Sequence, residues 1–309
     1  MVLSAAANLA NFDNLCVAPG LVQSWPWTWA GRSIEVCYET WGAGGEPLLL
    51  LPALSTVSSR REMWAIAHFL HQRFPEQYQI TALDWPGFGD SDRLSLSYQC
   101  DLYQHFLQAF VNTQFHRPVG VIAAGHAAGY VMATQNFSTQ NLWAKIVLVA
   151  PTWLGPFTAM GLPEHWRSSL RSLVRSPILG QALYALNTRP AFLRWMYRRH
   201  VFVDATRLTD EFIAQRYANT QRPGARYAPA AFVTGGLDPA RTREDFLGYF
   251  KGTSTPILLL LPEQAPPRSR AEMEAIAALP QVQTQRLPGT LGLAEERGDE
   301  VAEAIAWFL

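Results

Sequence analysis

The chain has 309 residues, of which 49% are hydrophobic and 12% aromatic, so it can bury a large core and is not expected to be disordered. Its 25 basic and 25 acidic side chains balance to a formal charge of zero, which argues against a nucleic-acid-binding protein. Cys16, Cys37 and Cys100 are scattered without metal-ligand spacing, and we expect neither a metal nor a cofactor.

The sequence carries no sign of export or of membrane insertion. Residues 1–15 lack the basic region that opens a secretory signal peptide. The apolar runs at 47–54 and 256–262 are far shorter than the ~20 residues that a membrane-spanning helix needs. Together with the scattered cysteines, these features predict a soluble, cytoplasmic protein.

Strands and helices are predicted to alternate over the first half of the chain. In chain order, we expect a strand at 33–41, a strand at 48–54, a helix near 59–74, a strand at 78–85, a helix at 100–115, a strand at 118–124, a helix at 127–137 and a strand at 143–151. The strands are continuous apolar runs, which is typical of a mostly parallel sheet with helices on both faces.

The alternation stops after residue 151 and resumes near residue 238. The segment between them has helical patterns and many aromatic residues but few strand signals. An all-helical insertion between two parallel strands would form a cap over the carboxyl ends of the strands, where open α/β sheets bind ligands. The predicted organisation is an N-terminal extension (1–29), a core in two parts (30–151 and 238–309) and a helical cap (152–237).

Three motifs follow one another in this frame. "DWPGFGDSD" (84–92) ends a strand in a tight glycine-rich loop, and "GHAAG" (125–129) is a small-residue turn between a strand and a helix. The segment from 287 to 309 is predicted to be the end of a last strand, a loop and a closing helix. Over residues 30–309 the chain resembles the α/β-hydrolase superfamily, particularly its capped esterases, lipases and haloalkane-dehalogenase-like members.

The resemblance implies a catalytic nucleophile, acid and histidine in that chain order. The nucleophile position falls on Ala127, and no Ser, Cys, Thr or Asp occurs between residues 120 and 132. The acid position falls on Ala265, with Glu263 two residues early. The histidine position falls on Leu291 or Ala294.

No histidine follows His200, so no alignment supplies the missing base. All three catalytic positions are therefore vacated, and hydrolysis by a triad is not expected. Other acids in the motifs, such as Asp84 and Asp90, are expected to hold their loop together through hydrogen bonds.

Backbone groups of the expected site do not depend on the missing side chains. Backbone N–H groups at Ala128 and at Ala53 or Leu54 are predicted to form a polar notch that binds a carbonyl or a carboxylate. His126 is interpreted as a packed histidine of the turn. With Ala127 and Trp153, these are the predicted ligand-binding residues.

The cap carries an uneven charge. Between residues 161 and 200, seven arginines face one acid, a net charge of +6. The favoured interpretation is an amphipathic cap helix, with Phe192, Trp195 and Met196 packed inward and the arginines in solvent. The alternative is a cap that meets an anionic membrane surface or an acidic partner.

The leading hypothesis is a non-hydrolytic member of the superfamily that binds a lipophilic small molecule between core and cap. Three alternatives stay open. One is a serine ester hydrolase whose nucleophile at position 127 was replaced by alanine. The others are an enzyme of another kind, with His126 or a cap residue as base, and an interaction module that uses the basic cap.

Overall fold

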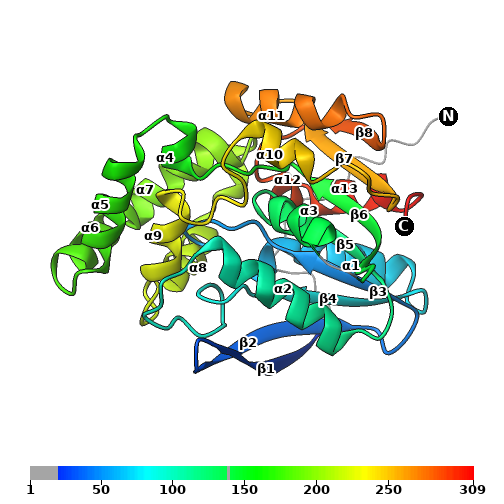
Figure 1. The fold of residues 1–309 in the computed structure, drawn as a ribbon, viewed down its shortest axis with the longest axis horizontal. Helices are drawn as coiled ribbons and strands as arrows, with labels where there is room; N and C mark the ends of the chain where they lie inside the picture. Colours follow the sequence, from blue (N-terminus) through cyan, green and yellow to red (C-terminus); the bar gives the residue numbers. More distant parts are fainter. Residues whose placement is uncertain (1–19, 138–139) are drawn as a thin grey trace.

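The computed structural model describes residues 20–137 and 140–309, and within these residues eight strands form one sheet (Figure 1). The order across the sheet is β1-β2-β4-β3-β5-β6-β7-β8. Strands β1 and β2 run antiparallel to each other, β2 runs antiparallel to β4, and all the other pairs are parallel. The strands are β1 (Leu21–Trp29), β2 (Arg32–Trp41), β3 (Glu46–Leu51), β4 (Tyr78–Leu83), β5 (Val119–Ala124), β6 (Trp143–Val149), β7 (Ile257–Pro262) and β8 (Val282–Leu287).

The central strands lie in the core because both of their faces are covered. Every residue of β7 is buried, as is every residue of β3 after Glu46. Such strands need continuous apolar sequence, and this confirms the mostly parallel α/β sheet predicted from the apolar runs.

The first strand was missed by the sequence prediction. Residues 21–29, which were assigned to an N-terminal extension, form β1 and pair along their whole length with β2. Trp25 and Trp27 of this edge strand pack edge-on against Phe110 and Phe106 of α2. Pro26 is tolerated because an edge strand leaves one row of backbone donors unpaired. Residues 1–19, which include Cys16 and the segment read for export signals, lie outside the described residues.

Helices cover both faces of the sheet (Figure 1). Helices α2 and α3 pack together on one face, and α1 packs against α13 on the other. The core helices are η1 (Arg60–Met63), α1 (Trp64–Arg73), α2 (Cys100–Gln114), α3 (Ala127–Phe137), α10 (Arg243–Gly248), α11 (Pro267–Ala277), α12 (Leu293–Glu296) and α13 (Gly298–Ile305).

A group of helices projects from the sheet between β6 and β7, on the left of Figure 1. We keep 152–237 as the proposed extent of this cap. Its helices are α4 (Pro156–Ala159), α5 (Glu164–Arg175), α6 (Leu179–Asn187), α7 (Pro190–Met196), η2 (Tyr197–Val201), η3 (Ala205–Arg207), α8 (Asp210–Thr220) and α9 (Tyr227–Val233). Across the described residues, no helix combines the length and the apolar character required to cross a bilayer.

Two acids of α12 hold the cap against the core. The Glu296 carboxylate accepts hydrogen bonds from the backbone N–H groups of Val203 and Asp204, at 2.8 and 2.6 Å. Glu295 forms an ion pair with Arg216 of α8. The cap is therefore held to the core by three charged side chains, Glu295, Glu296 and Arg216, all of which are largely buried.

The orientation predicted for helix α7 is wrong. Phe192 and Trp195 are 38% and 56% exposed, so both face solvent and not the core. Met196 alone packs partly inward, against the small apolar cluster that Val57 forms with the cap. The inward position that these aromatics were expected to fill is taken by Leu193, which is fully buried.

Candidate functional site

The turn between β5 and α3 has its left-handed residue at Gly125. Its φ is +52°, whereas Ala127 is already the first residue of α3 and has no positive φ. The strained position of a strand-to-helix nucleophile turn therefore lies two residues before the predicted one. Ala127 is fully buried in the core. Neither residue carries a nucleophilic group, so this correction moves the centre of the turn without supplying a nucleophile.

His126 is a buried, hydrogen-bonded residue of the turn, as interpreted from the sequence. Its Nε2 lies 2.7 Å from the carbonyl oxygen of Leu237 and 3.8 Å from Oδ1 of Asp238. Since a carbonyl only accepts, Nε2 carries the proton. Burial lowers the pKa of His126 although Asp238 opposes the shift, so the ring is neutral at pH 7. Asp238 itself accepts from the backbone N–H of Gly155 at 2.7 Å.

One of the predicted notch donors is already bonded within the protein. The Ala128 N–H donates to the carbonyl oxygen of Gly125 at 3.3 Å, at the start of α3. Leu54 has its side chain in the core, 2% exposed. The notch expected at these positions is thus partly closed by the chain itself.

The loops that hold the acid and histidine positions lie against each other. The backbone N–H of Gln264 donates to the Gly289 carbonyl at 2.9 Å, and the Gly289 N–H donates back to the Gln264 side chain at 2.6 Å. Next to these bonds, Ala265 and Ala294 are both 5% exposed, and Leu291 packs against the core. Apolar side chains occupy this region of the loops.

The aromatic residues expected to line a lipophilic pocket do not converge. The Trp153 indole stacks on Phe246 and donates to Glu272, which turns it toward helices α10 and α11. Trp166 and Trp195 are 61% and 56% exposed on the outer surface of the cap. Sequence spacing could not reveal this, because the direction of each cap helix depends on its tertiary contacts.

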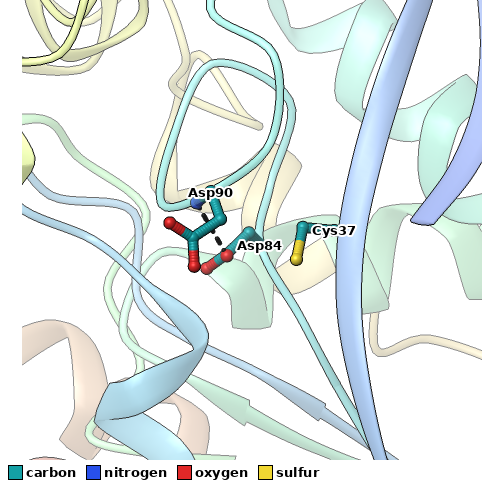
Figure 2. Close-up of side chains that lie close together, drawn as sticks. All are labelled: Cys37, Asp84 and Asp90. Carbon is teal, nitrogen blue, oxygen red and sulfur yellow. Dashed lines mark hydrogen bonds between the residues drawn. The ribbon is translucent and has the colours of Figure 1, made fainter. Parts of the chain in front are cut away.

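Figure 2 shows a cluster of Cys37, Asp84 and Asp90 in which the two carboxylates lie side by side. The ligand atoms of the three residues lie within 4.8 Å of one another, a spacing compatible with a metal ion. The backbone N–H of Asp90 donates to Asp84 at 2.8 Å, as the dashed line marks. The guanidinium of Arg60 supplies the cation here, since it pairs with Asp84, with Asp90 at 2.7 Å and with Glu39 at 3.2 Å.

The electrostatics of this cluster favour a permanent ion network. Burial raises the pKa of the Asp84 carboxyl, and the Arg60 guanidinium opposes that shift. Burial also works against the charge of Arg60, yet Asp84 and Asp90 hold the pKa of Arg60 above its ordinary value. The expectation that Asp84 and Asp90 fix their loop through hydrogen bonds is confirmed by these contacts.

A cavity of about 210 Å³ lies between the core and cap helix α8. The core contributes Ser59, Arg61, Gly89 and Asp90, and the cap contributes Gln215, Arg216, Ala218, Asn219 and Arg222. None of the six predicted ligand-binding residues is among them. The lining holds three guanidinium groups against one carboxylate, so the cavity favours an anionic group.

A buried acid stands behind this cavity. Glu62 is 7% exposed, and burial raises its pKa to about 7 although Arg216 opposes the shift. Arg216 is 6% exposed, reaches Ser59 Oγ at 3.4 Å and pairs with Glu295. The only sequence signal for this site was the pair Arg60 and Arg61 at the start of the helix predicted near 59–74, because Arg216 is 155 residues away from Arg61 in the chain.

The two thiols in the described residues are not candidate nucleophiles. Burial raises the pKa of Cys37 to about 11 and that of Cys100 to about 12. The Cys100 thiol donates to the carbonyl oxygen of Asp238 at 2.7 Å, at the edge of a second, open cavity of about 560 Å³. A protonated, hydrogen-bonded thiol does not attack an ester.

Comparison with known protein families gives one match, which spans most of the chain. A model described as the alpha/beta hydrolase family matches residues 48–304. This range contains every strand from β4 to β8, most of β3, the cap and both halves of the site described above. Among curated proteins, none matches the chain by sequence.

Several solved structures share the fold at low sequence identity. A thermophilic esterase from Thermogutta terrifontis is 17% identical with a TM-score of 0.69, over 93% of this chain and 97% of that one. A bromoperoxidase from Bacillus anthracis is 18% identical with a TM-score of 0.66, over 93% and 99%. A haloalkane dehalogenase from Agrobacterium tumefaciens is 16% identical with a TM-score of 0.67, over 93% and 96%. These likenesses establish the fold of this chain.

Proposed function

Because the chain belongs to the alpha/beta hydrolase family, we propose that it uses the fold of that family to bind a small molecule between core and cap without cleaving it. The main support for this proposal is that the segments expected to hold the nucleophile and the catalytic histidine contain neither. No Ser, Cys, Thr or Asp lies between residues 120 and 132, and no histidine follows His200. A triad mechanism needs both, since the histidine must take the proton of the nucleophile.

Neither His126 nor His200 is placed to act as the missing base. His126 is buried, with its Nε2 proton committed to Leu237, and its ring contacts Phe232 edge-on at 5.2 Å. The ring of His200 packs against the exposed Trp195. A base must reach the proton it takes, and neither ring adjoins a nucleophilic side chain. The surroundings of these two histidines favour a binding function over cleavage, and they disfavour a reaction that uses His126 as a base.

The cavity lining refines the class of ligand. A lipophilic molecule was predicted from the aromatic residues of the cap, but Arg61, Arg216 and Arg222 line the cavity between core and cap. Part of this charge is already balanced, since Arg222 pairs with Asp90 at 2.7 Å and Arg216 pairs with Glu295. We therefore propose a ligand with an anionic head, such as a carboxylate, that Arg61 and Arg222 bind, with any apolar tail directed away from the arginines. An intracellular location is part of this proposal.

The proposal is tested by the binding of octanoate and of 1-octanol, followed by isothermal calorimetry. Octanoate is expected to bind and 1-octanol is not, because only the carboxylate can accept hydrogen bonds from the guanidinium groups. Arg61→Gln should weaken octanoate binding about tenfold, the value of one charge-assisted hydrogen bond.

Arg32→Gln is the matched control, because Arg32 is exposed on β2 and does not line the cavity. Equal binding of the acid and the alcohol would contradict the anionic head. Equal losses of octanoate affinity in Arg61→Gln and Arg32→Gln would contradict binding in this cavity.

A further inference from the structure

The cap exposes an unusual share of the large apolar side chains. Of the twelve that are exposed in the described residues, nine lie between Met160 and Val203. Large exposed apolar residues gathered on one part of a molecule are a mark of an interaction surface, whereas single ones are ordinary. All but Met160 and Val203 lie on or next to helices α5, α6 and α7, in the group of helices on the left of Figure 1.

On each of these helices the exposed residues follow helical spacing. Trp166 and Leu173 on α5 are seven residues apart, as are Leu179 and Leu186 on α6, and Phe192 and Trp195 on α7 are three apart. Residues at these spacings share one face of a helix. Each helix therefore shows solvent an apolar stripe of the type that helices normally bury.

The connection between α5 and α6 is the most exposed apolar part of the cap. Ile178 is 81% exposed and Leu179 is 62% exposed, side by side at the start of α6. Helices α5 and α6 pack against each other, so this connection forms the end of a helical hairpin. We call Ile178 and Leu179 the hairpin tip.

The cap arginines divide into two groups. Four of them contact other residues of the protein; for example, Arg167 donates to Thr158 at 2.6 Å and Arg194 pairs with the exposed Asp210 at 2.5 Å. Arg171 and Arg175 make similar contacts, with Thr234 and Leu96. The other three, Arg189, Arg198 and Arg199, are exposed and have no ion pair with any described residue. They flank α7, whose Phe192 and Trp195 are themselves exposed.

We propose that this cap surface binds an anionic lipid bilayer, with the hairpin tip and the α7 aromatics in the interface and Arg189, Arg198 and Arg199 on the headgroups. Tryptophan and large aliphatic residues beside unpaired arginines are the composition of helices that lie in a membrane interface. Anionic headgroups neutralise the arginines, and each arginine near such a surface adds to the attraction.

A second copy of the chain fits this surface less well. A two-fold symmetric contact places the same patch on both partners, so Arg189, Arg198 and Arg199 of one copy would face those of the other. Glu164 pairs with Arg167 and Asp210 pairs with Arg194. Glu211 on α8 is exposed and has no ion pair with a described residue, but one acid does not balance three arginines. Charge complementarity thus favours a lipid surface.

Flotation of the full chain with vesicles tests this proposal. We expect it to float with an equimolar mixture of phosphatidylcholine and phosphatidylglycerol at low ionic strength, and much less with phosphatidylcholine alone. The double variant Ile178→Ser with Leu179→Ser should bind the mixed vesicles at least about tenfold more weakly, since it removes two inserted apolar side chains. The double variant Arg198→Gln with Arg199→Gln should bind mixed vesicles more weakly by a similar factor, and its binding to neutral vesicles should be unchanged.

Matched controls lie on the rest of the surface. Trp307→Ser removes a side chain that is 63% exposed near the C-terminus, and Arg32→Gln removes an exposed arginine of β2; both should float like the unchanged protein. Circular dichroism and thermal melting confirm that each variant is folded. Failure of the folded, unchanged protein to float with mixed vesicles overturns the proposal. So does self-association in solution that the Ile178→Ser, Leu179→Ser variant abolishes without any vesicle binding, because the occupant would then be a second copy.

Discussion

Position 125 requires glycine for two reasons, its backbone conformation and the lack of space for a side chain. Its φ of +52° lies in the left-handed region, and a Cβ at this position would stand 2.9 Å from the Cβ of Ala53. The turn between β5 and α3 therefore depends on glycine for its backbone and for its close approach to the loop after β3. The chain keeps the shape of a nucleophile turn although it has no nucleophile to present.

Gly125→Ala is expected to destabilise the protein by about 2–4 kcal/mol, because backbone strain and crowding against Ala53 act together. Gly31→Ala is the matched control: its φ is +74° and no atom lies within 4 Å of a Cβ built there. The control should cost only the backbone strain, about 1 kcal/mol. Urea unfolding of both variants measures the difference, and equal losses would show that Ala53 does not crowd this turn.

Glu62 is the second residue whose environment is unusual. Burial raises its pKa to about 7, well above the ordinary 4.5 of a glutamic acid. Between these values the folded protein keeps the proton that the unfolded chain has released. Stability should therefore fall as the pH rises through this window, by on the order of 3 kcal/mol.

Glu62→Gln removes the titrating group and keeps its size. We expect the free energy of unfolding of this variant to fall less between pH 5 and pH 7.5 than that of the unchanged protein. Other groups, such as His126, titrate in both proteins and cancel in the comparison. Parallel pH profiles for the two proteins would mean that Glu62 is already ionised at pH 5.

At the scale of elements, apolar strand sequence was the most informative signal. The continuous runs of β3 and β7 predicted buried parallel strands because only a covered strand tolerates apolar residues on both faces. Strand β1 escaped notice because Pro26 and alternating polar residues are typical of loops as well as of sheet edges. The site was predicted less accurately than the strands, because the direction of Trp153 and the position of Arg216 depend on how the cap packs on the core.

The fastening of the cap by α12 leads to a prediction for hydrogen exchange. Glu296→Ala removes the acceptor for the N–H groups of Val203 and Asp204, and should cost about 2–4 kcal/mol. Amide exchange in residues 197–208 should accelerate more than exchange in β3 or β7. Glu303→Ala, an exposed position on α13, is the control and should leave exchange unchanged. Uniform acceleration over the whole chain would instead indicate global destabilisation.

At the scale of the whole molecule, the chain has the fold of the alpha/beta hydrolase family, and we propose that it uses this fold to bind a ligand without cleaving it. The sheet carries the motif loops in the order predicted from "DWPGFGDSD" and "GHAAG", and a cap lies across them. A scaffold that holds an arginine-lined cavity between core and cap is suited to binding. The proposal that the chain does not hydrolyse esters rests on the residues at the predicted catalytic positions, Ala127, Ala265 and Leu291 or Ala294.

One measurement tests this account most directly: the hydrolysis of p-nitrophenyl butyrate by the unchanged protein and by Ala127→Ser, each against heat-denatured protein. We predict that neither protein hydrolyses the ester faster than its denatured control, because position 127 is buried at the start of α3 and no histidine follows His200 to activate a serine there. Saturable turnover by the unchanged protein would contradict the non-hydrolytic proposal. Turnover by Ala127→Ser alone would contradict it equally, by showing that the chain is a hydrolase whose nucleophile was replaced.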